Sequence, residues 1–541
     1  NPEGGVTVTL IINNNLEREG MKMKLDFATY KDKVMGCWAG KNIGGVLGAP
    51  FEGRRQVNDI SFYTQDLSMG PPPNDDLDLQ IIWLAAVERY GRNVNASILG
   101  EYWLSYCIPN WVEYGTGKAN LRAGLQPPLS GLIDNTYKDS CGCYIRSEIW
   151  ACLAPGNPDL AARYAYEDAI VDHEGEGMYG EIFFAALQSA AFVESDKRTL
   201  IDIALSYIPE ESATAKAILK ALECYDNHTD FREARIQIHN TAPGTFGIQS
   251  GTLSEIPVEG NEGMETGAPG FDAPENVAFT IAGWLYGGED FGRSLCMAVA
   301  CGEDTDCTCA TLGAVLGIIA GASGLPEEWT APLDDKIATL CIDKTSGGIW
   351  VPSTVTELTE RVMKAAPGFL GQDICDIFAE GGMTIECKEG KALYCSRTTD
   401  YLPKINGNGK DEALPIRELC SLSPYVVRYS FPAFNLMVDY ENSVFFKAGE
   451  ERKIKVTVTN SHTMRQQQWA RITVYMPSGV ELKNGRAFTL PLNNLYGSKA
   501  EAEIVFNADT FDGGKLEFII EVSLEGRHSS GAVKVTLMRE A

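Results

Sequence analysis

Two different patterns of hydrophobic and polar positions divide the chain. From Asp26 to about Ala366, apolar residues recur at helical spacing between loops rich in Gly, Pro and Asn, as in residues 275–287. Beyond this region, short segments such as 451–460 alternate apolar and polar residues, with turn signals between them. The first pattern predicts an all-α domain, and the second predicts an antiparallel β-sandwich of about seven strands.

The change of pattern predicts a multidomain chain with four segments. We expect an N-terminal extension over residues 1–23, an all-α domain over 24–368, a connecting segment over 369–420 and an immunoglobulin-like β-sandwich over 421–541. The length of 541 residues agrees with this division, because it exceeds what one ordinary core accommodates. Residues 241–274 form a polar stretch with seven glycines, which predicts a functional loop or lid rather than a connector.

The charge balance limits the classes of partner. The chain has 46 Lys and Arg against 73 Asp and Glu, a formal net charge of −27, and contains no basic run. Its overall field repels polyanions, so we expect neither nucleic acid nor an anionic membrane as a partner. No apolar stretch is long enough to predict a membrane span. A small-molecule substrate is the expected partner, and the sequence carries no signal for the oligomeric state.

The distribution of cysteines bears on the compartment. All 15 lie between Cys37 and Cys420, and the β-rich end of the chain has none. A disulfide scaffold would be expected to staple that end too, so the distribution favours reduced thiols and a cytoplasmic protein.

Acidic residues and cysteines crowd together at the start of the small, apolar segment Cys301–Gly321. Asp304 and Asp306 lie two residues apart just before a predicted helix, where acids suit the helix N-terminus. The cysteines suggest zinc, but none of them forms a CxxC pair, and the other pair of closely spaced cysteines, Cys141 and Cys143, is only CxC. A zinc tetrad is therefore not favoured, and the segment is either an acidic helix cap or half of an oxygen-ligand site.

A second acidic segment favours the oxygen-ligand site. Asn74, Asp75, Asp76 and Asp78 stand at the mouth of another predicted helix, after three prolines. Two such helix starts facing each other across a helical bundle would offer four carboxylates and additional oxygens to one or two Mg²⁺ ions. Like charges brought together in this way need a cation to be tolerable.

A third segment, residues 36–53, completes a resemblance. It is a predicted helix of small residues that ends in a loop carrying Glu52. Together with the NDD and DTD segments, in this order, it resembles the ADP-ribosylglycohydrolase family, as do "CGCYIRSEIW" and the helix and loop that end near His173. The resemblance covers about residues 27–368 and identifies the chain as a diverged member with an added C-terminal β-sandwich. It implies an all-α catalytic domain with a dinuclear Mg²⁺ site in a central cleft.

The resemblance also implies a set of ligands. The family's Thr-Asp-Asp and Asp-x-Asp-Thr elements match Asn74, Asp75 and Asp76, and then Asp304, Asp306 and Cys307. Both threonines are replaced, and a thiol such as that of Cys307 is a poor magnesium ligand, whereas the amide oxygen of Asn74 can serve. We therefore expect one of the two metal positions to be weaker or differently coordinated, unless Thr305 or Thr308 substitutes. The glycine pair Gly44-Gly45 is a further departure, because the family more often has Gly-Asp there.

The activity that the resemblance implies is cleavage of an N- or O-glycosidic bond at the anomeric carbon of a ribosyl or related sugar. The implied catalytic residues are Glu52, Asp76 and Asp306, and Glu52 and His173 are the implied substrate-binding residues. Two alternatives stay open: a metal-dependent glycosidase acting on a neutral riboside, nucleoside or other carbohydrate, and a non-catalytic protein that binds an ADP-ribose-type ligand.

Overall fold

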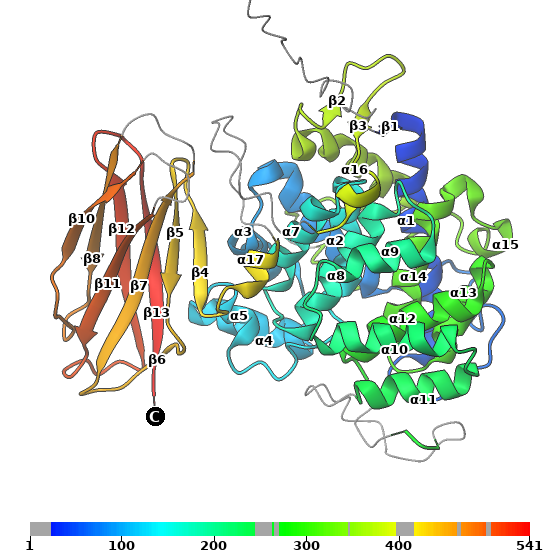
Figure 1. Cartoon of the computed structure of the whole chain (residues 1–541), viewed down its shortest axis with the longest axis horizontal. Coiled ribbons are helices and arrows are strands. Elements are labelled where there is room, and N and C mark those ends of the chain that lie inside the picture. Colours follow the sequence, from blue (N-terminus) through cyan, green and yellow to red (C-terminus); the bar gives the residue numbers. More distant parts are fainter. Residues whose placement is uncertain are drawn as a thin grey trace, which may run out of the picture.

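The structure is a computed structural model that describes residues 23–243, 262–264, 270–344, 347–395, 416–461, 467–493 and 499–540. The predicted extension, apart from its last residue, and most of the predicted lid lie outside these residues. A helical domain and a β-sandwich lie side by side (Figure 1). No helix in the described ranges is both long and apolar enough to cross a membrane. All 15 cysteines lie in these ranges, and none is joined in a disulfide.

The predicted all-α domain is confirmed, since helix follows helix through the first two-thirds of the chain. Its helices are α1 (Phe27–Gly48), α2 (Asp75–Tyr90), α3 (Ala96–Tyr106), α4 (Val112–Ala123), α5 (Leu129–Leu132), α6 (Glu148–Leu153), α7 (Pro158–Ala169), α8 (Glu176–Ala190), α9 (Lys197–Leu205), α10 (Ala213–Asp226), α11 (Phe231–Thr241), α12 (Ala273–Gly287), α13 (Phe291–Ala300), α14 (Thr305–Ala320), α15 (Glu327–Thr330) and α16 (Val355–Leu370).

The contact between α1 and α14 explains why both helices are so rich in small residues. The two helices lie side by side in Figure 1 and run antiparallel. Every fourth residue of α1 lies opposite a residue of α14. The facing pairs are Gly36 with Gly317, Gly40 with Gly313, Gly44 with Cys309, and Gly48 with Thr305. A Cβ atom on Gly40 would lie 2.0 Å from the carbonyl oxygen of Gly313, so the two backbones touch. This contact sets the C-terminal end of α1 beside the acidic start of α14.

A small sheet joins the start of the helical domain to the segment that follows it. Strands β1 (Lys24–Asp26), β3 (Thr384–Glu386) and β2 (Cys375–Asp376) pair antiparallel in that order. Ile385 and Leu393 belong to the same buried cluster as the helices, and α17 (Ile416–Ser421) packs on α7. In its described part, the segment predicted to connect the domains thus packs on the helical domain.

The C-terminal region is a sandwich of two five-stranded sheets, which confirms the predicted all-β domain. One sheet has the order β4-β5-β7-β11-β9 and the other β10-β8-β12-β13-β6; all neighbours are antiparallel except β13 and β6. The strands are β4 (Val426–Ser430), β5 (Phe434–Asp439), β6 (Phe445–Phe446), β7 (Glu451–Asn460), β8 (Gln468–Tyr475), β9 (Glu481–Leu482), β10 (Ala487–Leu492), β11 (Lys499–Asn507), β12 (Lys515–Leu524) and β13 (Ser530–Arg539). The ten strands exceed the expected number of about seven, and two of the additional strands, β6 and β9, have only two residues each and are too short to show an alternating pattern.

The sandwich is packed against the helical domain. Leu125, Leu129 and Ile133, around α5, belong to the buried cluster of the sandwich. The guanidinium of Arg428 on β4 donates a hydrogen bond to the carboxylate of Glu167 on α7. Figure 1 shows β4 at the edge of the sandwich that faces these helices. The sandwich therefore braces the side of the helical domain that carries α5 and α7.

Candidate active site

Two helix N-termini supply the predicted carboxylates. Asn74 precedes α2, and its Oδ1 accepts a hydrogen bond of 2.7 Å from the backbone N–H of Asp76. Asp304 precedes α14 but makes no capping hydrogen bond with its side chain, and Asp306 lies in the first turn. Acids at these positions face the positive ends of the helix dipoles, as the interpretation as acidic helix caps requires. The same carboxylates are also available to an oxygen-ligand site, so the two interpretations do not exclude each other.

The structure brings the two segments and the loop after α1 together. Ligand atoms of Asp76, Asp306 and Cys307 lie within 4.8 Å of one another, and so do those of Glu52, Asp304 and Asp306. Glu52, Asp76, Asp304 and Asp306 together form the acidic centre, and Cys307 borders it. The centre contains three of the four carboxylates predicted as metal ligands and all three predicted catalytic residues, Glu52, Asp76 and Asp306.

The loop that carries Glu52 is tied to the residue before Asp304. The backbone of Glu303 accepts a hydrogen bond from the N–H of Gly53 at 2.7 Å and donates one to the carbonyl of Arg54 at 2.9 Å. Its buried carboxylate accepts a further bond from Nε of Arg55 at 2.6 Å. Sequence reasoning missed Glu303, which takes the left-handed conformation with φ of 62° and looked like one more acid in a row. Its bonds hold Glu52 over the start of α14.

Several oxygens of the centre are buried without a hydrogen-bond partner. Both carboxylate oxygens of Asp76 and the Oδ1 atoms of Asp304 and Asp306 have none, and these residues are only 2%, 2% and 5% exposed. Glu52, by contrast, is exposed at the mouth of the centre. Burying charged carboxylates without partners is costly, and oxygen-liganded divalent cations are what such groups ordinarily bind. The residues present therefore fit a divalent metal ion.

The pKa values reflect this crowding. Burial, and then the repulsion of Asp75 and Asp304, raises the pKa of Asp76 to about 7, although Lys41 opposes the rise. Although part of the Glu52 side chain is exposed, burial of its carboxylate among neighbouring groups, and then repulsion from Asp304, Asp75 and Asp76, raises the pKa of Glu52 to about 8. The ammonium of Lys41 already pairs with Glu148 at 3.1 Å, so it does not neutralise the centre. A cation bound there would lower these pKa values.

A thiol that was not predicted as a site residue also borders the centre. The Sγ of Cys141 donates a hydrogen bond of 2.6 Å to Oδ2 of Asp304, and Cys307 lies within 4.8 Å of both. The hydroxyls considered as substitutes point elsewhere: Thr305 donates to the carbonyl of Gly48, and Thr308 to that of Thr305. Sequence reasoning noted the CxC pair but had no means of placing it beside Cys307, because the two are far apart in the chain.

The remaining acids of the NDD segment differ in their surroundings. Asp75 is half-buried beside the Tyr114 hydroxyl, and burial raises its pKa. Asp78 is fully buried and accepts hydrogen bonds from the backbone N–H groups of Leu340 and Cys341. Asp75 thus lies beside the acidic centre, whereas Asp78 holds a neighbouring loop in place.

His173, predicted to bind substrate, is fully buried. Its Nδ1 lies 2.8 Å from the Asp172 carboxylate and its Nε2 lies 2.7 Å from the Ser140 hydroxyl. Asp172 in turn pairs with Arg146 at 2.8 Å. Since both ring nitrogens are engaged and no surface is exposed, His173 presents no atom to a substrate in this structure. It supports the backbone next to Cys141 instead.

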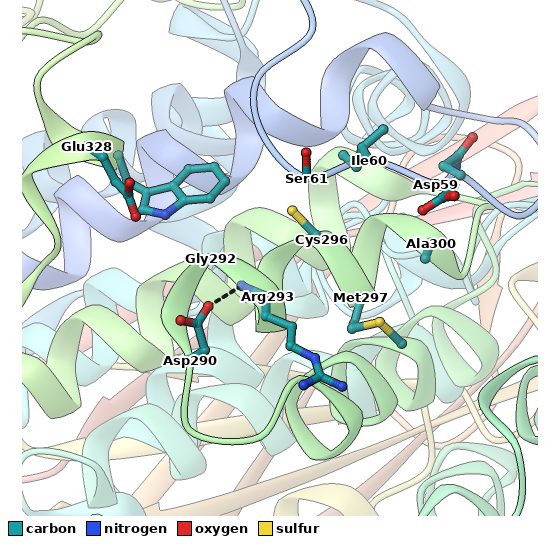
Figure 2. A pocket seen from close by; sticks show the side chains of 12 residues that line it. Asp59, Ile60, Ser61, Asp290, Gly292, Arg293, Cys296, Met297, Ala300 and Glu328 are labelled. Atoms are coloured by element: carbon teal, nitrogen blue, oxygen red, sulfur yellow. Dashed lines mark hydrogen bonds between the residues drawn. The ribbon is translucent and has the colours of Figure 1, made fainter.

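A separate pocket of about 320 Å³ lies beside α13 (Figure 2). Asp59, Ser61, Arg293, Cys296 and Glu328 are among the residues that line it, and none of the four residues of the acidic centre does. The pocket combines charges of both signs, and no prediction from the sequence fell on it.

Comparisons with known proteins bear on the helical domain. A sequence model of the ADP-ribosylglycohydrolase family matches residues 26–366, more than half of the chain. The chain belongs to this family. No curated protein matches the chain. A solved structure described as "ADP-ribosylglycohydrolase-related protein complex" is similar, with 18% identity and a TM-score of 0.38 over 63% of this chain and 99% of that one. Membership of the family supports a hydrolase that acts on glycosidic bonds, and the acidic centre lies within the matched residues.

Proposed function

We propose that the protein is a metal-dependent hydrolase that cleaves an N- or O-glycosidic bond at the anomeric carbon of a ribosyl or related sugar, with one or two Mg²⁺ ions as cofactor. The observation that carries the proposal is the set of buried, unpartnered carboxylate oxygens of Asp76, Asp304 and Asp306, gathered at two helix N-termini inside the family's matched region. Bound Mg²⁺ would supply positive charge that orients the sugar hydroxyls and polarises water.

The chain's own residues divide the remaining work. Asp76, Asp304 and Asp306 would hold the metal, with Asp75 and Asn74 at its edge. Glu52 is the exposed member of the centre and the one that a substrate meets first. In the reaction a water oxygen bonds to the anomeric carbon and the bond to the leaving group breaks. Glu52 passes a proton to the leaving atom and recovers one from the water.

The proposal is tested by hydrolysis assays on ADP-ribosyl-arginine, ADP-ribosyl-serine, nucleosides and aryl glycosides, with Mg²⁺ and with EDTA. We expect turnover of at least one of these substrates, lost with EDTA and restored by Mg²⁺. Glu52→Gln should lower kcat by about 10²- to 10⁴-fold, the usual contribution of a positioned acid or base. Asp306→Asn should abolish the response to metal.

Glu328→Gln is the matched control, because Glu328 is an exposed glutamate that lines the other pocket. Its turnover should equal that of the unchanged protein. Turnover that survives both complete metal removal and Asp306→Asn would refute the proposed mechanism. Binding of ADP-ribose without turnover of any substrate would favour the non-catalytic alternative.

A further inference from the structure

Asp304 lies between two chemically different sets of ligand atoms, namely other carboxylates of the acidic centre and two thiols that border it. On one side Glu52, Asp304 and Asp306 offer only oxygen atoms. On the other side, Cys141 and Cys307 offer two sulfur atoms beside the same aspartate, all three ligand atoms within 4.8 Å of one another. Oxygen ligands suit Mg²⁺, whereas sulfur ligands select softer ions such as Zn²⁺.

The sulfur side is a built site rather than a chance approach of thiols. Cys141 is 1% exposed, and its backbone N–H donates a hydrogen bond of 2.8 Å to the carbonyl of Phe271. Its thiol lies 2.6 Å from Oδ2 of Asp304, and the Oδ1 of that same carboxylate is buried without a partner. Asp304 is itself held by Asn276, whose Oδ1 accepts a hydrogen bond of 3.1 Å from its N–H. The ligand atoms are therefore already gathered before an ion binds.

The Sγ of Cys307 lies near two further aspartates as well as near Cys141 and Asp304. It lies within 4.8 Å of ligand atoms of Asp76 and Asp306, in the first turn of α14. If residue 307 carried a hydroxyl, Cys141 would be the only sulfur ligand in this cluster. The thiol instead makes both sulfur atoms available to one ion.

The geometry points to a second metal position, formed by Cys141, Asp304 and Cys307, that binds a thiophilic divalent ion such as Zn²⁺ next to the Mg²⁺ of the proposed function. On binding, each thiol releases its proton to solvent and its sulfur bonds to the ion. Three protein ligands leave a fourth position of a tetrahedral zinc ion open to water or substrate. The inference rests on the proposed function only in that both use Asp304.

The test is calorimetric titration of the metal-free, full-length protein with Zn²⁺ in the presence of excess Mg²⁺. The buffer contains a reductant that keeps the cysteines reduced without itself binding metal. We expect one zinc ion per chain that Mg²⁺ does not displace. Cys307→Thr should weaken Zn²⁺ binding by at least about 100-fold, because even residues that only support a ligand cost 10- to 100-fold. The same change should leave Mg²⁺ binding intact or strengthen it.

Two further measurements sharpen the test. Co²⁺ in place of Zn²⁺ should give a sulfur-to-metal charge-transfer band that weakens in Cys141→Ser and in Cys307→Thr. Cys296→Ser is the matched control: Cys296 is a buried helical cysteine that lines the other pocket and is not one of the proposed ligands, and its loss should change neither the band nor the affinity. Zinc affinity unaffected by Cys307→Thr, displacement of Zn²⁺ by Mg²⁺, or a Cys141–Cys307 disulfide in the isolated protein would overturn the inference.

The two proposals fail separately. Thiol-dependent Zn²⁺ binding in a protein that hydrolyses none of the substrates would refute the proposed function and leave the sulfur site standing. Mg²⁺-dependent turnover without a thiol-dependent zinc site would do the opposite.

Discussion

The backbone contact between α1 and α14 is tested most directly by Gly40→Ala. A Cβ at this position would lie 2.0 Å from the carbonyl oxygen of Gly313 and 2.6 Å from its carbonyl carbon. Both atoms are backbone and cannot rotate away. Since real Cβ atoms keep at least 3.0 Å from such neighbours, the two helices must separate by about 1 Å.

The cost follows from two opposing effects. Overpacking of a tight interior costs about 1–3 kcal/mol, and the upper end applies where only backbone can yield. Replacing a helical glycine by alanine contributes about 1 kcal/mol in the other direction. We therefore expect a net loss of about 2 kcal/mol, which lowers the thermal midpoint of a helical domain of this size by roughly 3 °C.

The measurement is thermal and denaturant unfolding followed by circular dichroism, with Gly368→Ala as the matched control. Gly368 is an exposed glycine within α16, with nothing within 4 Å of an added Cβ. The control should stabilise the protein by about 0.5–1 kcal/mol. Because the separation also shifts the end of α1 against the start of α14, the Gly40 variant should show a smaller gain in midpoint on adding Mg²⁺. A Gly40→Ala protein as stable as the control variant would refute the argument.

Three further predictions concern buried charge. In metal-free protein, Asp76→Asn should raise the thermal midpoint, because it removes a buried charge that has no hydrogen-bond partner. It should also abolish the rise in thermal midpoint that divalent ions produce in the unchanged protein. A metal-free variant less stable than the unchanged protein would contradict this. Burial raises the pKa of Glu113 to about 7, so stability from this group is full below its unfolded value of about 4.3 and is lost as the pH rises through about 7. Glu113→Gln should therefore stabilise the protein in unfolding experiments above that pH and change little in acid, and a pH-independent effect would count against it. Arg428→Ala removes the partner of the buried Glu167 carboxylate, and Arg428 helps to hold the pKa of that carboxylate below its usual value. The change should lower the free energy of unfolding, measured with denaturant, by about 1.5–3 kcal/mol. This loss should shrink as the pH falls through the range where Glu167 takes up a proton.

Much of the fold could be predicted from the chain itself. Helical periodicity in the first two-thirds and alternation in the last third depend on which side of each element is buried, and that information is local. The glycines at every fourth position of α1 indicate a closely packed helix, whereas only the structure shows that its partner is α14. Strands of two residues, such as β6 and β9, leave no periodic trace and could not be counted.

The candidate site was predictable where residues have local roles. Asp76 and Asp306 stand at helix starts that the sequence marks with acids, and the resemblance to the family pairs the two segments. The sequence could not show that His173 is buried between Asp172 and Ser140, because Ser140 comes from another loop, although Asp172 is its neighbour in the chain. It could not show the role of Glu303 either, whose bonds reach back to residues 53–55.

The sequence by itself therefore determined the two domains, the acids that gather at the helix starts and the small residues that let two helices touch. Only the tertiary structure decided which groups meet: it set Cys141 beside Asp304 and Cys307, and it left Thr305 bonded to the backbone of Gly48. The physical reason is that periodicity and capping depend on neighbours along the chain, whereas a metal centre depends on distances of a few ångströms between segments far apart in the chain.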